Sequence, residues 1–155
     1  MNGNEFIKLL GLTSDDEKIR KFLSDFGITQ KPKLKKGDFD AIVMNEKLGI
    51  EITFTDERYL DVKSNDYEEG ALVLSNVRMY GDGNDTFKLF SPELPLGLRF
   101  DLNRKEAFEK IGQKPARDNK ETAKARWDFK NYCLFLTFDK KYSKIRIVAV
   151  QLPLE

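Results

Sequence analysis

The spacing of apolar residues changes once along the chain, and this change constrains the fold more than any other sequence feature. Before Phe39, apolar residues recur at helical spacing, as in the run "SDDEKIRKFLSDF" of residues 14–26. After Phe39 they recur at every second position, as at Ile50, Ile52 and Phe54, which is the period of a strand with one buried face. The sequence therefore predicts an α+β fold in which an N-terminal helical pair precedes an antiparallel sheet of about six strands with one inserted helix.

Local signals place the two N-terminal helices. The first is predicted to start near Asn4, and the second to start with a capping box formed by Ser14 and Glu17 and to end at Gly27. The basic segment "TQKPKLKKG" that follows contains a proline and is predicted to be a solvated surface loop, with nucleic-acid binding as the alternative.

Turn and cap signals divide the remainder of the chain into strands and one helix. A hairpin is predicted to turn at residues 45–49, and further strands at residues 71–80 and 86–91. A helix is predicted from an N-cap at Asn103, with Glu106 at the capping-box position, to Gly112. The polar segment "QKPARDNKETAK" is predicted to be a loop, and "DKKYS" to be the turn of a final hairpin with aromatic strands.

Length and patterning point to one soluble domain. A chain of 155 residues fits a single domain over residues 1–155 that can bury a core without metal or disulfides. No apolar run approaches the roughly 20 residues that span a bilayer, and the first residues lack the features of a secretion signal. We expect a cytoplasmic protein that makes no membrane contact.

The absence of histidine and the presence of one cysteine exclude most common catalytic sites. Serine–histidine triads, cysteine–histidine dyads and nearly all zinc sites need an imidazole near neutral pH. Cys133 lies in the apolar run "YCLFLTF" and is predicted to be a buried, unreactive thiol. What remains for an enzyme is carboxylate chemistry, as acid–base pairs or as oxygen-ligand sites for magnesium or calcium. Our expectation is a protein that performs no catalysis and needs no cofactor or metal.

Charge is unevenly distributed along the chain. Residues 38–85 hold twelve acidic and four basic residues, a net charge of −8, although the whole chain carries +1. If the predicted hairpins lie side by side, they present an acidic surface that would steer a basic partner protein. Tyrosines in the same acidic loop can bury area against such a partner. The predicted partner-binding residues are Asp56, Glu57, Tyr59, Asp61, Asp66, Tyr67, Glu68 and Glu69. The alternative is that these acids only keep a long loop soluble.

One pattern in the same region suggests an alternative function. Asp38 or Asp40, followed about a dozen residues later by Glu51, has the spacing of nucleases in which two carboxylates hold magnesium. Thr53 occupies the position where such enzymes have a lysine. This pattern supports the alternative hypothesis of a degenerate magnesium-dependent nuclease. The other interpretation of the same residues is an ordinary hairpin without a functional role for its acids.

The second half of the chain resembles bacterial immunity proteins of the contact-dependent growth inhibition and pyocin type. The resemblance covers residues 73–153 and rests on a "Tyr-Gly" strand end, a "Leu-Pro-x-Gly-Leu-x-Phe" element, a helix ending in "Gly-x-x-Pro" and a final aromatic hairpin. The matching positions of the second and third features are Leu94, Pro95, Gly97, Leu98, Phe100, Gly112 and Pro115. The resemblance implies a small cytoplasmic protein that binds a cognate toxin domain, often a nuclease with a basic surface, and occludes its active site. We expect no direct contact of this protein with nucleic acid.

A shorter stretch also resembles another group. The run "GLRFDLNRKEAFEKIGQKP" is similar to the helix entry and stop of small outer-membrane assembly lipoproteins. Those proteins need an export signal ending in a lipidated cysteine, and the single cysteine here is Cys133. We interpret this overlap as shared local structure in which the helix packs Phe108 and Ile111 against the sheet.

Overall fold

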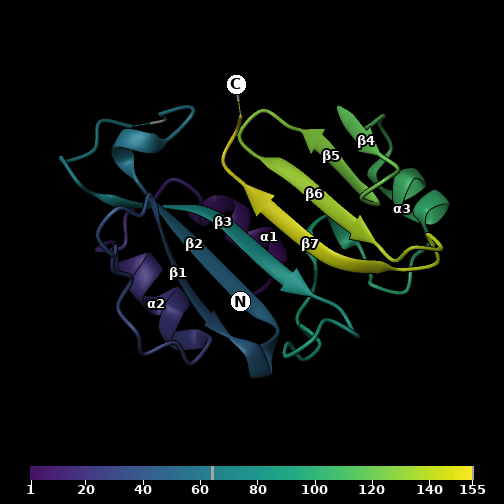
Figure 1. Ribbon diagram of the computed structural model, residues 1–155, viewed down its shortest axis with the longest axis horizontal. Coiled ribbons are helices and arrows are strands. Elements are labelled where there is room, and N and C mark those ends of the chain that lie inside the picture. The colour runs from purple at the N-terminus through teal and green to yellow at the C-terminus, as the bar shows by residue number, and fades with distance from the viewer. Residues whose placement is uncertain (64, 155) are drawn as a thin grey trace.

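A computed structural model describes residues 1–63 and 65–154. Its centre is an antiparallel sheet with the strand order β1-β2-β3-β7-β6-β5-β4 (Figure 1). The strands are β1 (Asp40–Asn45), β2 (Ile50–Asp56), β3 (Leu72–Tyr80), β4 (Arg117–Asn119), β5 (Lys124–Asp128), β6 (Cys133–Phe138) and β7 (Ile145–Gln151). The predicted α+β class and antiparallel sheet are confirmed, with seven strands where about six were expected.

Helices cover one face of this sheet and leave much of the other face open. The α-helices are α1 (Gly3–Leu9), α2 (Glu17–Asp25) and α3 (Arg104–Ile111), and short 3-10 helices are η1 (Glu46–Leu48), η2 (Glu57–Tyr59) and η3 (Pro95–Gly97). Strand β2 shows the division, because Ile50, Ile52 and Phe54 are buried in the core while the residues between them are partly exposed. Because side chains alternate along a strand, these intervening residues belong to the opposite face.

The N-terminal helical pair is confirmed, with one correction to its boundaries. Helix α1 has its N-cap at Asn2, whose side chain forms a capping box with Glu5. The predicted capping box of Ser14 and Glu17 is wrong, because the N-cap of α2 is Asp16, which accepts a hydrogen bond from the Lys18 amide at 2.8 Å. Ser14 lies before the helix instead, where its backbone amide donates a hydrogen bond to the Leu72 carbonyl at 2.9 Å.

The strand predicted at residues 86–91 is absent, and this segment crosses the end of the sheet as a loop. Strand β3 is already paired on one side with β2 and on the other with β7, so no edge is free for another strand. The Phe87 ring instead stacks on the Tyr80 ring at 3.9 Å. Phe90 is buried and packs its ring against Phe6 and Phe26 at 5.9 and 6.1 Å. Aromatic packing therefore decides the path of this segment.

The polar segment predicted as a loop at residues 113–124 contains strand β4 and the start of β5. All three residues of β4 are exposed, so the strand has no alternating pattern that could reveal it. Its anchor is the next strand, where Trp127 is fully buried and donates a hydrogen bond from Nε1 to the Gln113 carbonyl at 2.9 Å. The Trp127 ring also meets the Phe108 ring of α3 edge-on at 5.1 Å.

The helix predicted from Asn103 to Gly112 is confirmed as α3, together with its caps. The Asn103 side chain accepts from the Glu106 amide at 2.8 Å, and the Glu106 carboxylate accepts from the Asn103 amide at 3.0 Å. Gly112 has φ +81°, the left-handed conformation that ends many helices.

Two of the residues that carry the resemblance, Gly81 and Pro95, lie where elements pack closely together. A Cβ on Gly81 would lie 2.8 Å from the Phe100 ring, and one on Gly3 of α1 would lie 2.3 Å from the ring of Pro95.

Cys133 is buried, as predicted, and burial raises the pKa of its thiol. Among the described residues, the helices are too short and too polar to cross a bilayer.

Candidate functional site

A groove of about 490 Å³ lies on the open face of strands β1 to β3. The loop after β2 borders it on one side and the segment after β7 on the other, and both lie at the same end of the sheet in Figure 1. Its lining consists of Phe39, Asp40, Ile42, Glu51, Thr53, Thr55, Tyr59, Leu60, Asp61, Val62, Ser75, Asn76, Arg78, Gln151, Leu152, Pro153 and Leu154. The groove combines apolar walls with a polar floor.

A chain of hydrogen bonds across three strands forms one part of the floor. Ser75 Oγ lies 2.7 Å from Thr55 Oγ1, and Thr55 Oγ1 donates to Asp40 Oδ1 at 2.7 Å. Asp40 pairs with Thr55 in the register of β1 and β2, so the two side chains lie on the same face. The carboxylate of Asp40 is thereby held in one orientation at the edge of the groove.

Glu51 and Arg78 form the other charged part of the floor. They are opposite each other on β2 and β3, and Glu51 Oε1 lies 3.8 Å from Arg78 Nη1. Asn76, next to them on β3, donates from Nδ2 to Gln151 Oε1 at 3.0 Å. In the part of the chain that the structure describes, Arg78 is the one cationic residue of the groove lining, and it compensates the charge of Glu51.

Exposed apolar side chains form the wall nearest β1. Phe39 and Tyr59 place their ring centroids 4.3 Å apart, yet they remain 57% and 49% exposed. Ile42 is 52% exposed and Val62 is 36% exposed. Clusters of exposed apolar side chains with polar neighbours mark interaction surfaces more often than isolated ones do.

Two of the predicted partner-binding residues are buried and serve the loop itself. Asp56 is 1% exposed and receives two hydrogen bonds from the Arg58 guanidinium, at 3.1 and 2.7 Å. These bonds hold the pKa of Asp56 below the ordinary value for an aspartate. Glu57 is 7% exposed and accepts from Lys63 Nζ at 2.9 Å. Both carboxylates therefore hold the loop against the end of β2.

The other predicted residues divide between the groove and the rim of the loop. Tyr59 and Asp61 line the groove. Tyr67 donates a hydrogen bond from its hydroxyl to the Gly11 carbonyl at 2.7 Å, which ties the loop to the segment after α1. Asp66, Glu68 and Glu69 are exposed on the loop and do not line the groove.

Sequence reasoning named Tyr59 but missed the other apolar side chains of this site. Neither Phe39 nor Ile42 was predicted to be a functional residue, yet both line the groove. A signal was present, because Ile42 alternates with buried Ala41 and Val43 and must belong to the opposite face. The sequence did not reveal that no helix would cover that face.

The structure does not bring the carboxylates of the nuclease alternative together. Asp40 pairs with Thr55 and Glu51 with Met44, which places the two acids four positions apart along the strands, roughly 13 Å at about 3.3 Å per residue. Asp38 is exposed before β1. Within residues 1–63 and 65–154, no three His, Cys, Asp or Glu side chains are grouped to hold a metal ion.

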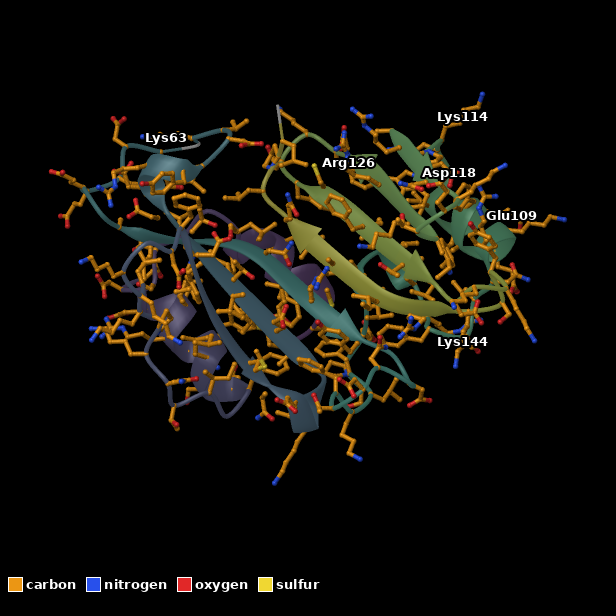
Figure 2. All side chains as sticks on the ribbon, viewed as in Figure 1. Lys63, Glu109, Lys114, Asp118, Arg126 and Lys144 are labelled. Atoms are coloured by element: carbon orange, nitrogen blue, oxygen red, sulfur yellow. The ribbon has the colours of Figure 1, made fainter. Side chains whose placement is uncertain are left out.

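Charge is segregated in space as well as in sequence. Strands β1, β2 and β3 lie side by side at one end of the sheet, so the net charge of −8 on residues 38–85 is concentrated there. Residues 104–146 hold thirteen basic and six acidic residues, a net charge of +7, and build α3 and the opposite end. Figure 2 shows Lys114, Arg126 and Lys144 on that half, away from Lys63 in the loop after β2.

A second hollow lies beside the segment that contains η3. It measures about 770 Å³, and its lining includes Leu89, Phe90, Leu98 and Phe100. Arg99 at its edge pairs with Asp101 at 3.0 Å. The walls belong to the segment that packs α1 and α3 onto the sheet, so we assign this hollow to the packing of that segment.

Comparisons with family models, with curated protein sequences and with solved structures give no match for this chain.

Proposed function

We propose that the protein is an immunity protein that binds a cognate bacterial toxin domain and occludes its active site. The observation that carries the proposal is the groove on the open face of β1 to β3, where exposed aromatic side chains adjoin carboxylates. The resemblance of residues 73–153 to immunity proteins, drawn from sequence, adds to it. The function consists of binding and includes no chemical step.

The surface suits a basic protein partner. Aromatic side chains such as Phe39 and Tyr59 bury large areas at interfaces, while carboxylates around them pair with lysine and arginine. A nuclease toxin must present a basic groove to the phosphodiester backbone. An acidic face that carries apolar anchors is complementary to such a groove, and its occupation would exclude the nucleic acid.

Co-expression tests this function directly. A toxin-like region, sought in the genes next to the gene for this protein, would be expressed in bacteria alone or together with the protein, and growth would be measured. We expect toxicity from the region alone and rescue by the protein. A toxic neighbour that the protein fails to neutralise would contradict the proposal for that pair.

A groove variant links rescue to the site. Phe39→Ser with Tyr59→Ser removes the aromatic wall, and we expect rescue to be lost while the protein stays folded. The comparison variant is Phe129→Ser with Tyr132→Ser, a pair of rings 4.8 Å apart beside β5 and β6 that are half-buried and pack against the core. Circular dichroism of both variants would show that a loss of rescue is not a loss of folding.

A further inference from the structure

We infer that the groove on β1 to β3 receives an arginine side chain of the partner protein, with its guanidinium group between Asp40 and Asp61. This inference rests on the proposed function and names the chemical group that the site recognises. It follows from the charges, the walls and the hydrogen bonds of the groove.

The first step concerns which groove charges lack compensation. Among residues 1–63 and 65–154, four acidic or basic side chains line the groove, namely Asp40, Glu51, Asp61 and Arg78. Arg78 compensates Glu51 across β2 and β3. Among the described residues, no lysine or arginine lies within salt-bridge distance of Asp40 or Asp61. The groove therefore has an excess of two negative charges near the loop after β2, where a cation is favoured.

The second step concerns the two cations of the loop after β2. Arg58 is committed to Asp56 through two hydrogen bonds, and Lys63 is committed to Glu57. Both acids that hold them are nearly fully buried, so release of either cation would leave a buried carboxylate unpaired. Arg58 and Lys63 are therefore not available to pair with Asp40 and Asp61. A positive charge from a partner protein can pair with these two carboxylates instead.

The third step concerns the shape of the cation. Asp40 is held in one orientation by Thr55, and the Phe39–Tyr59 pair forms an adjacent flat apolar wall. A guanidinium group is planar, has donors on several edges and is weakly hydrated, so it can reach two carboxylates while its stem packs against rings. An ammonium group is a compact, strongly hydrated charge and uses such a wall less well.

A pair of small probes tests the inference without any toxin. Nα-acetyl-arginine amide and its neutral near-isostere Nα-acetyl-citrulline amide would be titrated into the 15N-labelled full chain, and amide shifts would be followed by NMR. We expect saturable shifts at the residues that line the groove with the arginine probe only. Equal shifts with both probes, or shifts outside the groove, would overturn the inference, as would the absence of shifts.

Isosteric variants locate the charge. Asp40→Asn with Asp61→Asn keeps the acceptor for Thr55 but removes both charges, and we expect a loss of affinity of roughly tenfold or more, as for hydrogen bonds to charged groups. The control Glu68→Gln with Glu69→Gln removes two charges from the rim, outside the groove lining, and should bind the arginine probe nearly as the wild type does. Equal losses of affinity for the arginine probe in both variants would show that only the net charge of the protein matters, and would contradict the proposed arginine site.

The growth assay distinguishes a failure of the arginine site from a failure of the proposed immunity function. If the wild type and the double variant Asp40→Asn with Asp61→Asn both rescue growth fully, the immunity function is supported and the arginine site is contradicted. Specific binding of the arginine probe without rescue by the wild type would support the site and contradict the toxin partner. Rescue that the charge variant loses and the rim variant keeps is the result we expect.

Discussion

Asp56 has the sequence surroundings of an exposed surface residue, but its side chain is buried and stabilises the loop. It lies in a charged loop and was predicted to bind a partner, but its side chain is 1% exposed and pairs with Arg58 through two hydrogen bonds. Its Oδ1 also accepts from the Arg58 amide at 3.0 Å, which caps η2. Buried carboxylates with such partners stabilise the folded state only while they are ionised.

This arrangement predicts a specific dependence of stability on pH. The Arg58 side chain lowers the pKa of Asp56 in the folded state, so the contribution is complete above the pKa of the unfolded chain, about 4. It is lost as the pH falls through the folded value. We expect the difference in unfolding free energy between wild type and Asp56→Asn to be largest at pH 7 and to shrink below pH ~4. Urea unfolding monitored by Trp127 fluorescence at pH 7, 4 and 3 measures it.

The control for this prediction is Asp66→Asn, because Asp66 is exposed on the same loop. Its unfolding free energy should follow that of the wild type at each pH. A difference between wild type and Asp56→Asn that stays constant from pH 7 to pH 3 would show that the Asp56–Arg58 pair does not titrate with folding.

At the level of the elements, helix propensity and steric overlap have opposite effects at Gly3, where α1 contacts η3. Gly3 is the first residue of α1, where alanine is preferred by helix propensity, by up to about 1 kcal/mol. A Cβ at this position would lie 2.3 Å from Pro95 Cδ and 2.6 Å from the Pro95 backbone nitrogen. A clash with a ring and a backbone atom cannot be relieved by a rotamer change, and overpacking costs about 1–3 kcal/mol.

We therefore expect Gly3→Ala to destabilise the protein despite the better helix former, by about 1–2 kcal/mol. The matched control is Ser24→Ala, at an exposed position in α2, which propensity alone should leave unchanged or slightly more stable. Chemical denaturation of both variants decides the sign. A stabilised Gly3→Ala protein would mean that α1 moves away from η3 at little cost.

The elements also show how far sequence signals reach. Helix α3 was predictable to the residue because Asn103, Glu106 and Gly112 all act within the helix itself. The segment at residues 86–91 was wrongly predicted as a strand because its aromatic residues suit a strand locally, while the pairing of β3 with β7 depends on residues about 70 positions away. The groove follows the same rule, since the alternation at Ile42 was readable but the absence of a covering helix was not.

On the scale of the whole molecule, the strand order turns a sequence asymmetry into an electric dipole. The acidic region of residues 38–85 and the basic region of residues 104–146 occupy opposite ends of one sheet. A net charge of +1 conceals this arrangement. A dipole of this kind orients the protein during the approach to a charged partner, and its effect is strongest at low ionic strength.

The dipole predicts that the position of a charge change matters more than its size. Glu68→Lys with Glu69→Lys alters the acidic end, and we expect association with a basic toxin to slow by roughly tenfold at low salt and to depend less on salt. Glu109→Lys with Glu121→Lys makes the same change in charge at the opposite end, where Figure 2 shows Glu109. This control should keep an association rate close to that of the wild type. Stopped-flow kinetics at several salt concentrations compares them, and equal slowing in both variants would mean that net charge, not the dipole, governs the encounter.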